Sequence, residues 1–174
     1  YLTRKGNVVD QAFYYDGKTL TLFGKKVNFY ASMDVLPTIE ETIDRAHEEV
    51  GLIAPGADII YQNTYDVLME DAVSGFYAGL STIQGVECHH LAFRNSEVDW
   101  QIWIENDDTP LPCKYLITSK WTRGEPQFSV VFFNWNTAAK LKDELFVFTP
   151  PEGAEKIEFI PIATDVATPE LTRE

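Results

Sequence analysis

The three histidines are the first side chains to consider for metal binding or acid–base catalysis, and their spacing fits neither role. His89 and His90 are adjacent in a segment with β-strand alternation, so their side chains point to opposite faces and do not ligate one metal ion together. His47 lies on an expected helix without a His-Glu-x-x-His spacing around it. The sequence therefore predicts no metal site.

Motifs for nucleophilic catalysis and cofactor binding are also absent from the sequence. It contains no Gly-x-Ser-x-Gly elbow, no Gly-x-Gly-x-x-Gly and no phosphate loop. The acidic run Glu105 to Asp108 lacks the ligand spacing of a calcium loop and is typical of a polar hairpin tip. We therefore expect a protein that is not an enzyme and needs no cofactor.

The two cysteines, Cys88 and Cys113, are too few for a disulfide scaffold. If the hairpins of the expected sheet close symmetrically, Cys88 lies opposite Ile104, and Ile104 lies opposite Pro112. That register places Cys113 two strands away from Cys88 and on the other face, beyond the reach of a disulfide. We expect two free, buried and inert thiols.

Composition and charge describe the protein that surrounds these side chains. The chain has 174 residues, 45% of them hydrophobic, and a formal net charge of −13. The acidic balance argues against binding to nucleic acid, and no apolar run approaches the roughly 20 residues that span a bilayer, so an integral membrane protein is not expected. We expect one globular domain over residues 1–160 and a C-terminal tail over residues 161–174.

The first part of the chain contains signals for a hairpin and for helices. Asp16-Gly17-Lys18 between two β-rich runs predicts a β-hairpin. Thr38 and Glu41 have the spacing of a capping box, which predicts a helix that ends at Gly51. The expected elements are strands over 11–15, 19–23 and 27–31, a helix over 39–50, and short helices over 57–60 and from 64 or 65 to about 72.

From Gly75 onward the apolar pattern has a period of two, which predicts an antiparallel meander. Its expected strands are 75–84, 86–94, 98–105, 113–121 and 127–135, followed by a short strand over 146–148 and an edge over 157–160. In the symmetric register both faces of this sheet carry many apolar side chains. Such a surplus indicates a second covering layer, a partner or a ligand, although aromatic residues also tolerate half-exposure on a curved sheet.

Four segments in this order resemble the LolA and LolB-like superfamily of periplasmic lipoprotein carriers and outer-membrane lipoprotein receptors. They are Phe13–Leu20 ("FYYDGKTL"), Gly85–Leu91 ("GVECHHL"), Trp103–Lys114 ("WIE…LPCK") and Phe146–Ala154 ("FVFTPPEGA"). Together with Asp99–Ile104 and the Pro37-Thr38-Ile39 helix start, they make the chain similar to a bacterial family of predicted periplasmic proteins, the domain of unknown function DUF2092.

The resemblance implies an α+β fold in which a strongly curved antiparallel sheet, an incomplete or half β-barrel, is lidded by short helices. It also implies a periplasmic location, with a signal peptide, an N-terminal helix and first strands upstream of Tyr1. We expect a carrier or binding protein that holds a lipid, an acyl chain or another hydrophobic small molecule between sheet and helices, with a lipoprotein or membrane-associated partner. The predicted lining residues are Trp100, Ile102, Ile104, Leu116, Phe128, Val130 and Phe132 from the sheet, with Ile43 and Leu68 from the lid.

The alternative function is a protein–protein interaction module. In the symmetric register the second face of the sheet carries its own aromatic surface, which would dock on another protein or on a second copy of this chain. The residues of that surface are Trp103, Tyr115, Ile117, Trp121, Phe133 and Trp135.

Overall fold

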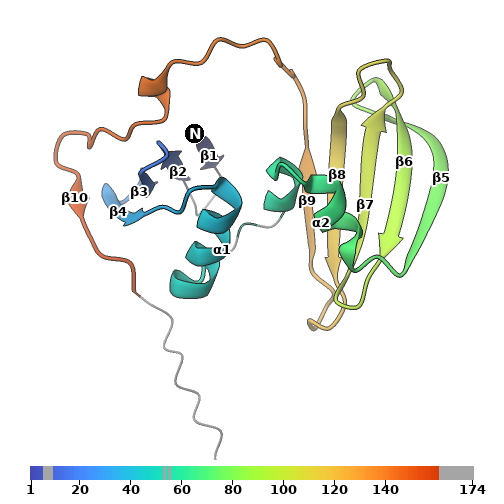
Figure 1. The fold of residues 1–174 in the computed structure, drawn as a ribbon, viewed down its shortest axis with the longest axis horizontal. Helices are drawn as coiled ribbons and strands as arrows, with labels where there is room; N and C mark the ends of the chain where they lie inside the picture. Colours follow the sequence, from blue (N-terminus) through green and yellow to red (C-terminus); the bar gives the residue numbers. More distant parts are fainter. Residues whose placement is uncertain (6–9, 53, 55, 161–174) are drawn as a thin grey trace, which may run out of the picture. The chain divides into compact units, whose positions relative to one another are not determined.

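The protein divides into two compact units, and the second is a continuous segment between the two segments of the first. The computed structural model describes residues 1–5, 10–52, 54 and 56–160. Residues 1–54 and 140–174 belong to the first unit, and residues 55–139 form the second. Each unit contains one five-stranded sheet, so the described fold is α+β and mostly β (Figure 1). The single domain over 1–160 stays a prediction, and the expected tail lies outside the described residues.

The sheet of the first unit has the strand order β1-β2-β3-β4-β10. Its strands are β1 (Leu2–Lys5), β2 (Asp10–Tyr15), β3 (Thr19–Gly24), β4 (Phe29–Asp34) and β10 (Glu155–Lys156). The predicted hairpin is confirmed: Asp16 Oδ1 accepts hydrogen bonds from the backbone N–H groups of Lys18 and Thr19, at 2.8 and 2.7 Å. Gly17, which follows Asp16 in the turn, has a φ of +81°, a conformation that residues with a side chain rarely adopt.

Helix α1 (Ile39–Val50) begins and ends where the sequence predicts. Thr38 and Glu41 form both hydrogen bonds of the capping box, and Gly51 ends the helix in the left-handed conformation. Thr42 is buried on the inner face, where its hydroxyl donates to the Thr38 carbonyl and accepts from the Leu36 N–H. The chain before the helix is thereby fixed to its first turn.

After residue 139 the chain returns to the first unit, and here two expected strands are wrong. Residues 146–148 form no strand; a short 3₁₀ turn, η2 (Asp143–Leu145), precedes them. The ring of Phe148 instead packs against Tyr14, Phe23 and Tyr30, with centroids 5.0 to 5.4 Å apart. The edge expected at 157–160 is replaced by β10, which pairs with β4 in parallel.

The second unit is the predicted meander, with the strand order β5-β6-β7-β8-β9 (Figure 1). Its strands are β5 (Ser74–Ile83), β6 (Val86–Arg94), β7 (Val98–Glu105), β8 (Pro112–Ser119) and β9 (Gln127–Val131). The 3₁₀ helix η1 (Ala57–Ile60) and helix α2 (Thr64–Glu70) precede them. β9 ends earlier than expected. Both sheets keep open edge strands, so neither closes into a barrel among the described residues.

The strand register of this sheet differs from the symmetric one by one residue between β6 and β7 and over most of the β7–β8 pairing, and by three residues between β8 and β9. Cys88 lies opposite Glu105 and not Ile104, while Ile104 does lie opposite Pro112 as expected. Tyr115 pairs with both Ile102 and Val130. Because side chains alternate along a strand, a shift by an odd number of residues exchanges the faces. The expected faces of β6 and β8 are therefore wrong relative to β7.

Candidate functional site

One face of the second sheet is lined almost entirely by apolar side chains. Trp100 and Ile102 lie in its centre on β7, and Phe93 and Leu91 on β6 pair with them from one side. We call this surface the covered face. Its residues are Leu91, Phe93, Trp100, Ile102, Ile104, Tyr115, Ile117, Phe128, Val130 and Phe132.

Two short helical segments, η1 and α2, lie against the covered face, and we call residues 57–70 the cap (Figure 1). The cap packs Ile59, Leu68 and Met69 onto the buried cluster of Trp100 and its neighbours. Helices of this length are unstable alone in water, so packing on the sheet must hold them in place. The apolar area that they contribute is small, and the cap should open more easily than the strands.

A polar contact joins the cap to the sheet beneath it. The hydroxyl of Tyr115, which is almost completely buried, donates a hydrogen bond to Oδ2 of Asp58 at 3.0 Å. Asp58 Oδ1 is buried, and no described residue donates to it. Burial raises the pKa of Asp58 above its ordinary value. Burial, and next the charge of Asp58, raises the pKa of Tyr115.

This contact predicts an unusual pH dependence for the second unit. Because the pKa of Asp58 is raised on folding, its protonated form stabilises the folded state below the unfolded pKa, and that contribution is lost as the pH rises through the folded pKa. Asp58→Asn removes the buried charge and keeps an acceptor for Tyr115, so we expect it to raise stability at pH 7 relative to wild type and to flatten this dependence. Urea unfolding between pH 4 and 7 measures both effects.

The matched variant is Tyr115→Phe, which deletes the donor and leaves Asp58 buried. We expect it to lower the free energy of unfolding at pH 7 by about 1–3 kcal/mol. Equal stabilities of wild type and both variants across the pH range would contradict a contribution from this contact.

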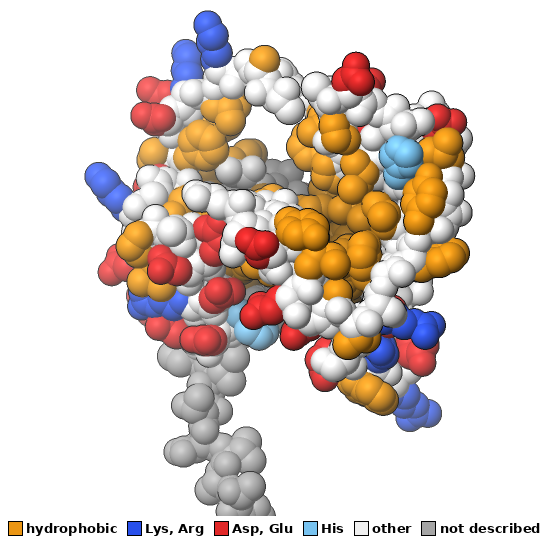
Figure 2. All heavy atoms as spheres, turned by 45° about the vertical axis from the view of Figure 1, so that its right-hand side comes forward, with side chains coloured by type: hydrophobic (Ala, Val, Ile, Leu, Met, Phe, Trp, Pro, Cys, Tyr) orange, Lys and Arg blue, Asp and Glu red, His pale blue; other side chains and the backbone are white. Residues whose placement is uncertain are grey.

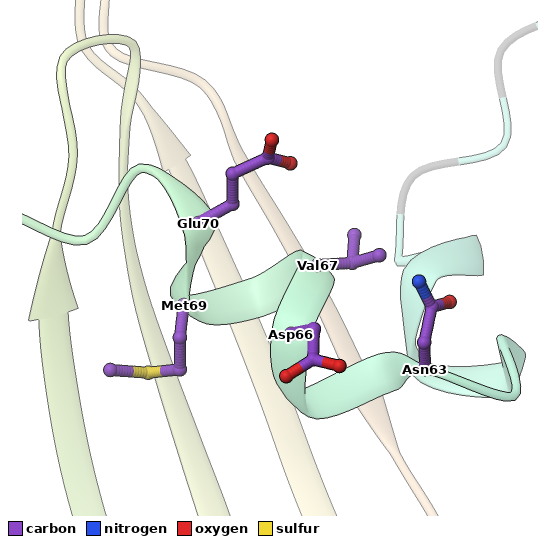
Figure 3. Close-up of a pocket in the computed structure, with 5 residues that line it drawn as sticks. All are labelled: Asn63, Asp66, Val67, Met69 and Glu70. Carbon is purple, nitrogen blue, oxygen red and sulfur yellow. The ribbon is translucent and has the colours of Figure 1, made fainter.

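A shallow depression of about 430 Å³ lies at the cap, along helix α2 and the residue before it (Figure 3). It is lined by Asn63, Asp66, Val67, Met69 and Glu70. Met69 also packs on the buried cluster beneath the cap. Two carboxylates and an amide make this surface polar, and it does not coincide with the predicted lining residues.

The structure brings together most of the side chains that the sequence predicts as a hydrophobic lining. Trp100, Ile102, Ile104, Phe128, Val130 and Phe132 share the covered face, and Leu68 packs on it from the cap. Leu116 lies on the opposite face beside Trp103. Ile43 is half-buried on α1 and belongs to the first unit.

The opposite face of the sheet is also partly buried, although no described helix of the second unit packs on it. Trp103 is stacked on His90, with ring centroids 4.1 Å apart, and the Nζ of Lys114 lies 4.6 Å above its ring. Cys88, Trp103 and Cys113 form one buried cluster. The expectation that Cys113 faces away from Cys88 is wrong, because a bulge between Trp103 and Ile104 shifts the register beside it.

Both thiols are free and buried, as the sequence predicts. Burial, and next hydrogen bonding and charge interaction with the Cys88 thiol, raises the pKa of Cys113 to about 12. The thiols also donate to backbone carbonyls, Cys88 to Val86 at 3.4 Å and Cys113 to Leu111 at 3.9 Å. A thiol of such high pKa is a poor nucleophile at neutral pH.

The aromatic surface predicted for docking does not form as one face. Tyr115 and Ile117 lie on the covered face, while Trp103 is buried on the opposite one. Trp121, Phe133 and Trp135 are exposed. Figure 2 shows hydrophobic side chains gathered on the second unit, and the exposed apolar residues of its edge include Phe76, Tyr77 and Leu80 on β5.

Sequence reasoning missed Asp58, the polar residue that joins cap and sheet. A signal for it existed: Asp58 is a lone acidic side chain inside the apolar run Ala57 to Ile60, directly after Gly56. Gly56 has a φ of +76°, and a Cβ there would lie 3.2 Å from the Phe128 ring. The close approach of backbone and ring explains why a glycine precedes the cap.

The comparisons with known proteins agree with a periplasmic location. A family model described as "Predicted periplasmic protein (DUF2092)" matches residues 1–160. No curated protein matches the chain. In the described part of the chain, no helix has the length and apolar character needed to cross a membrane.

Proposed function

Because the chain belongs to the DUF2092 family of predicted periplasmic proteins, we propose that it is a periplasmic, non-enzymatic carrier or binding protein for a hydrophobic ligand. The ligand class is a lipid or acyl chain, which a lipoprotein or membrane-associated partner would supply or receive. The resemblance of four sequence segments to LolA and LolB-like carriers supports this class and a LolA-like curved sheet.

The observation that carries the proposal is the imbalance between the covered face and its cap. The face presents an apolar surface across β6 to β9, and from the short cap Ile59, Leu68 and Met69 pack on its buried centre. Phe128 and Val130 on β9 and Phe132 beyond it remain half-buried. An acyl chain would cover this remaining apolar area, with a gain of about 0.8 kcal/mol for each CH₂ group buried.

The net charge of the protein indicates which part of a lipid it would recognise: the acyl chain, and not an anionic headgroup. The chain carries a net charge of −13, and a surface of that sign repels anionic lipid headgroups. Recognition by apolar contact needs no basic residues on the covered face.

We expect ligand loading to protect the cap from hydrogen exchange. Delipidated protein loaded with a saturated fatty acid should exchange more slowly over residues 57–70 than the empty protein, while strand 98–105 is protected in both samples. Native mass spectrometry on the same samples should detect the bound fatty acid. Equal exchange of the cap in both samples, with no bound mass, would contradict the carrier function.

A matched pair of variants on β9 tests the face. Phe128 belongs to the covered face and Ser129, next to it, is exposed on the other side. Phe128→Glu should abolish fatty-acid binding and Ser129→Glu should retain it, with circular dichroism confirming that both variants fold. If neither the wild type nor the two variants bind fatty acid, and the wild type self-associates in sedimentation, the interaction module is the better function. Exposed Trp121 and Phe133 favour that alternative.

A further inference from the structure

β5, an outer strand of the second sheet, is long, uncharged and open on one side. It runs for ten residues, Ser74–Ile83, without a charged side chain or a proline. β6 pairs with one side of it, and no described strand pairs with the other. An edge strand of this kind presents backbone N–H and C=O groups to which another extended strand can bind.

The other edge strands in the described part of the chain differ from β5. β1 has four residues and carries Arg4 and Lys5, and β10 has two residues, both charged. β9 has five residues, and its apolar side chains are half-buried. Short length and charged side chains commonly protect a sheet edge from pairing with another chain, and β5 has neither feature.

The most exposed part of β5 is its first half. Residues 74–78 are all exposed, and among them Phe76 is 67% and Tyr77 is 52% exposed. A bulge between Tyr77 and Gly79 ends this regular run, because it shifts the pairing with β6 by one residue. Aromatic side chains are enriched in protein–protein interfaces, so two exposed rings on an open strand indicate a docking edge.

The partner that fits this edge is the same strand of a second copy. The chain carries a net charge of −13, so two copies repel each other on average. β5 adds no charge to a contact between them, and its apolar residues match those of an identical strand. Homodimers with a two-fold axis use the same surface patch on both copies, as pairing of β5 with itself does.

We propose that the protein forms a homodimer in which β5 pairs antiparallel with β5 of a second copy, so that the two five-stranded sheets become continuous. With a two-fold axis perpendicular to the sheet, opposite residues lie on the same face, and the residue on the axis pairs with itself. Phe76 is the centre of the exposed run 74–78, which places it on the axis. The two Phe76 rings then lie opposite each other, and Tyr77 lies opposite the partner's Gly75.

The size of this contact predicts a weak, reversible dimer. A stable interface buries about 800 Å² on each partner, and one short run of paired strand provides less than this. Salt screens the repulsion between two acidic copies, so dimerisation should increase with ionic strength. The inference does not depend on the carrier function, and either one can fail alone.

Sedimentation velocity of the full chain, at micromolar and at submillimolar concentration, tests for the dimer. We expect a dimer fraction that rises with concentration and with salt. Amide exchange followed by NMR locates the contact: amides of residues 74–78 that point to the open side should exchange several-fold more slowly in the concentrated sample, while those of β9 stay unchanged. A monomer at every concentration, or a dimer that protects β9 instead, would overturn the proposal.

Cysteine substitutions test the register. Phe76→Cys brings two thiols together at the axis, so mild oxidation should convert the variant to a disulfide-linked dimer. Thr82→Cys is the matched control, because Thr82 is exposed on the same strand but lies far from the axis, and this variant should stay uncross-linked. Cys88 and Cys113 are buried in both variants. Equal cross-linking of the two variants would count against the proposed pairing.

A charged substitution separates the local contact from the overall charge. Phe76→Lys makes the protein less acidic, yet it places two like charges opposite each other at the axis. We expect it to weaken dimerisation by about tenfold or more. Ser129→Lys makes the same change of charge at an exposed position of β9 and should retain the dimer. Circular dichroism checks that both variants fold, and equal dimerisation of the two would contradict an interface at β5.

Discussion

Trp100→Ala is expected to lower the free energy of unfolding of the second unit by about 3–5 kcal/mol. The Trp100 side chain is 4% exposed, stacks on Phe93 with centroids 4.2 Å apart, and meets the edge of Tyr115 at 6.1 Å. Its removal leaves a cavity beneath the cap that neighbouring strands cannot fill without breaking their pairing. The urea midpoint, followed by circular dichroism, should fall while the slope of the transition stays unchanged.

Trp121→Ala is the matched control, because it deletes the same side chain from an exposed position. Trp121 is 76% exposed, and its indole N–H donates to the Ser96 carbonyl. We expect its effect to stay within about 1 kcal/mol. A Trp100 variant as stable as the Trp121 variant would mean that the cluster under the cap does not hold the unit together.

Phe148→Ala is expected to lower the free energy of unfolding of the first unit by about 2–4 kcal/mol and to detach the returning C-terminal segment. Its ring contacts Tyr14, Phe23 and Tyr30, which lie on β2, β3 and β4. Without it, β10 is held by the hydrogen bonds from Glu155 N–H to Asn28 and from Ile157 N–H to Tyr30. Hydrogen exchange at these two amides should become much faster.

Val147→Ala supplies the comparison at the neighbouring position, where the side chain is exposed. It should leave the exchange of both amides near the wild-type rate. Slow exchange at both amides in Phe148→Ala would show that β10 does not need the aromatic contacts.

Signals confined to a few neighbouring residues predicted the local elements well. The Asp16–Gly17 turn and the capping box of Thr38 and Glu41 are confirmed in detail, because each is a set of hydrogen bonds within four residues. The strand predicted over 146–148 is wrong for the opposite reason. The alternation of Phe146 and Phe148 is typical of a strand, but long-range ring contacts decide the conformation of this segment.

The sequence allowed us to predict which apolar residues belong to the candidate site, but not which of them share one face of the sheet. Trp100, Ile102 and Phe128 were placed together correctly, because the shifts on either side of β8 compensate between β7 and β9. Leu116 was misplaced, because it lies on β8 itself. Composition does not reveal a single-residue slip or the bulge that causes Cys113 to face Cys88.

The first unit is formed from both ends of the chain, which sets an order of events as the chain emerges into the periplasm. Residues 55–139 are contiguous, so the second unit can fold as soon as these residues have emerged. The first unit cannot complete its sheet at that stage, since β10 and Phe148 are among the last described residues of the chain. The amino-terminal strands therefore finish folding last, and the edge of β4 stays open until the carboxyl-terminal segment pairs with it.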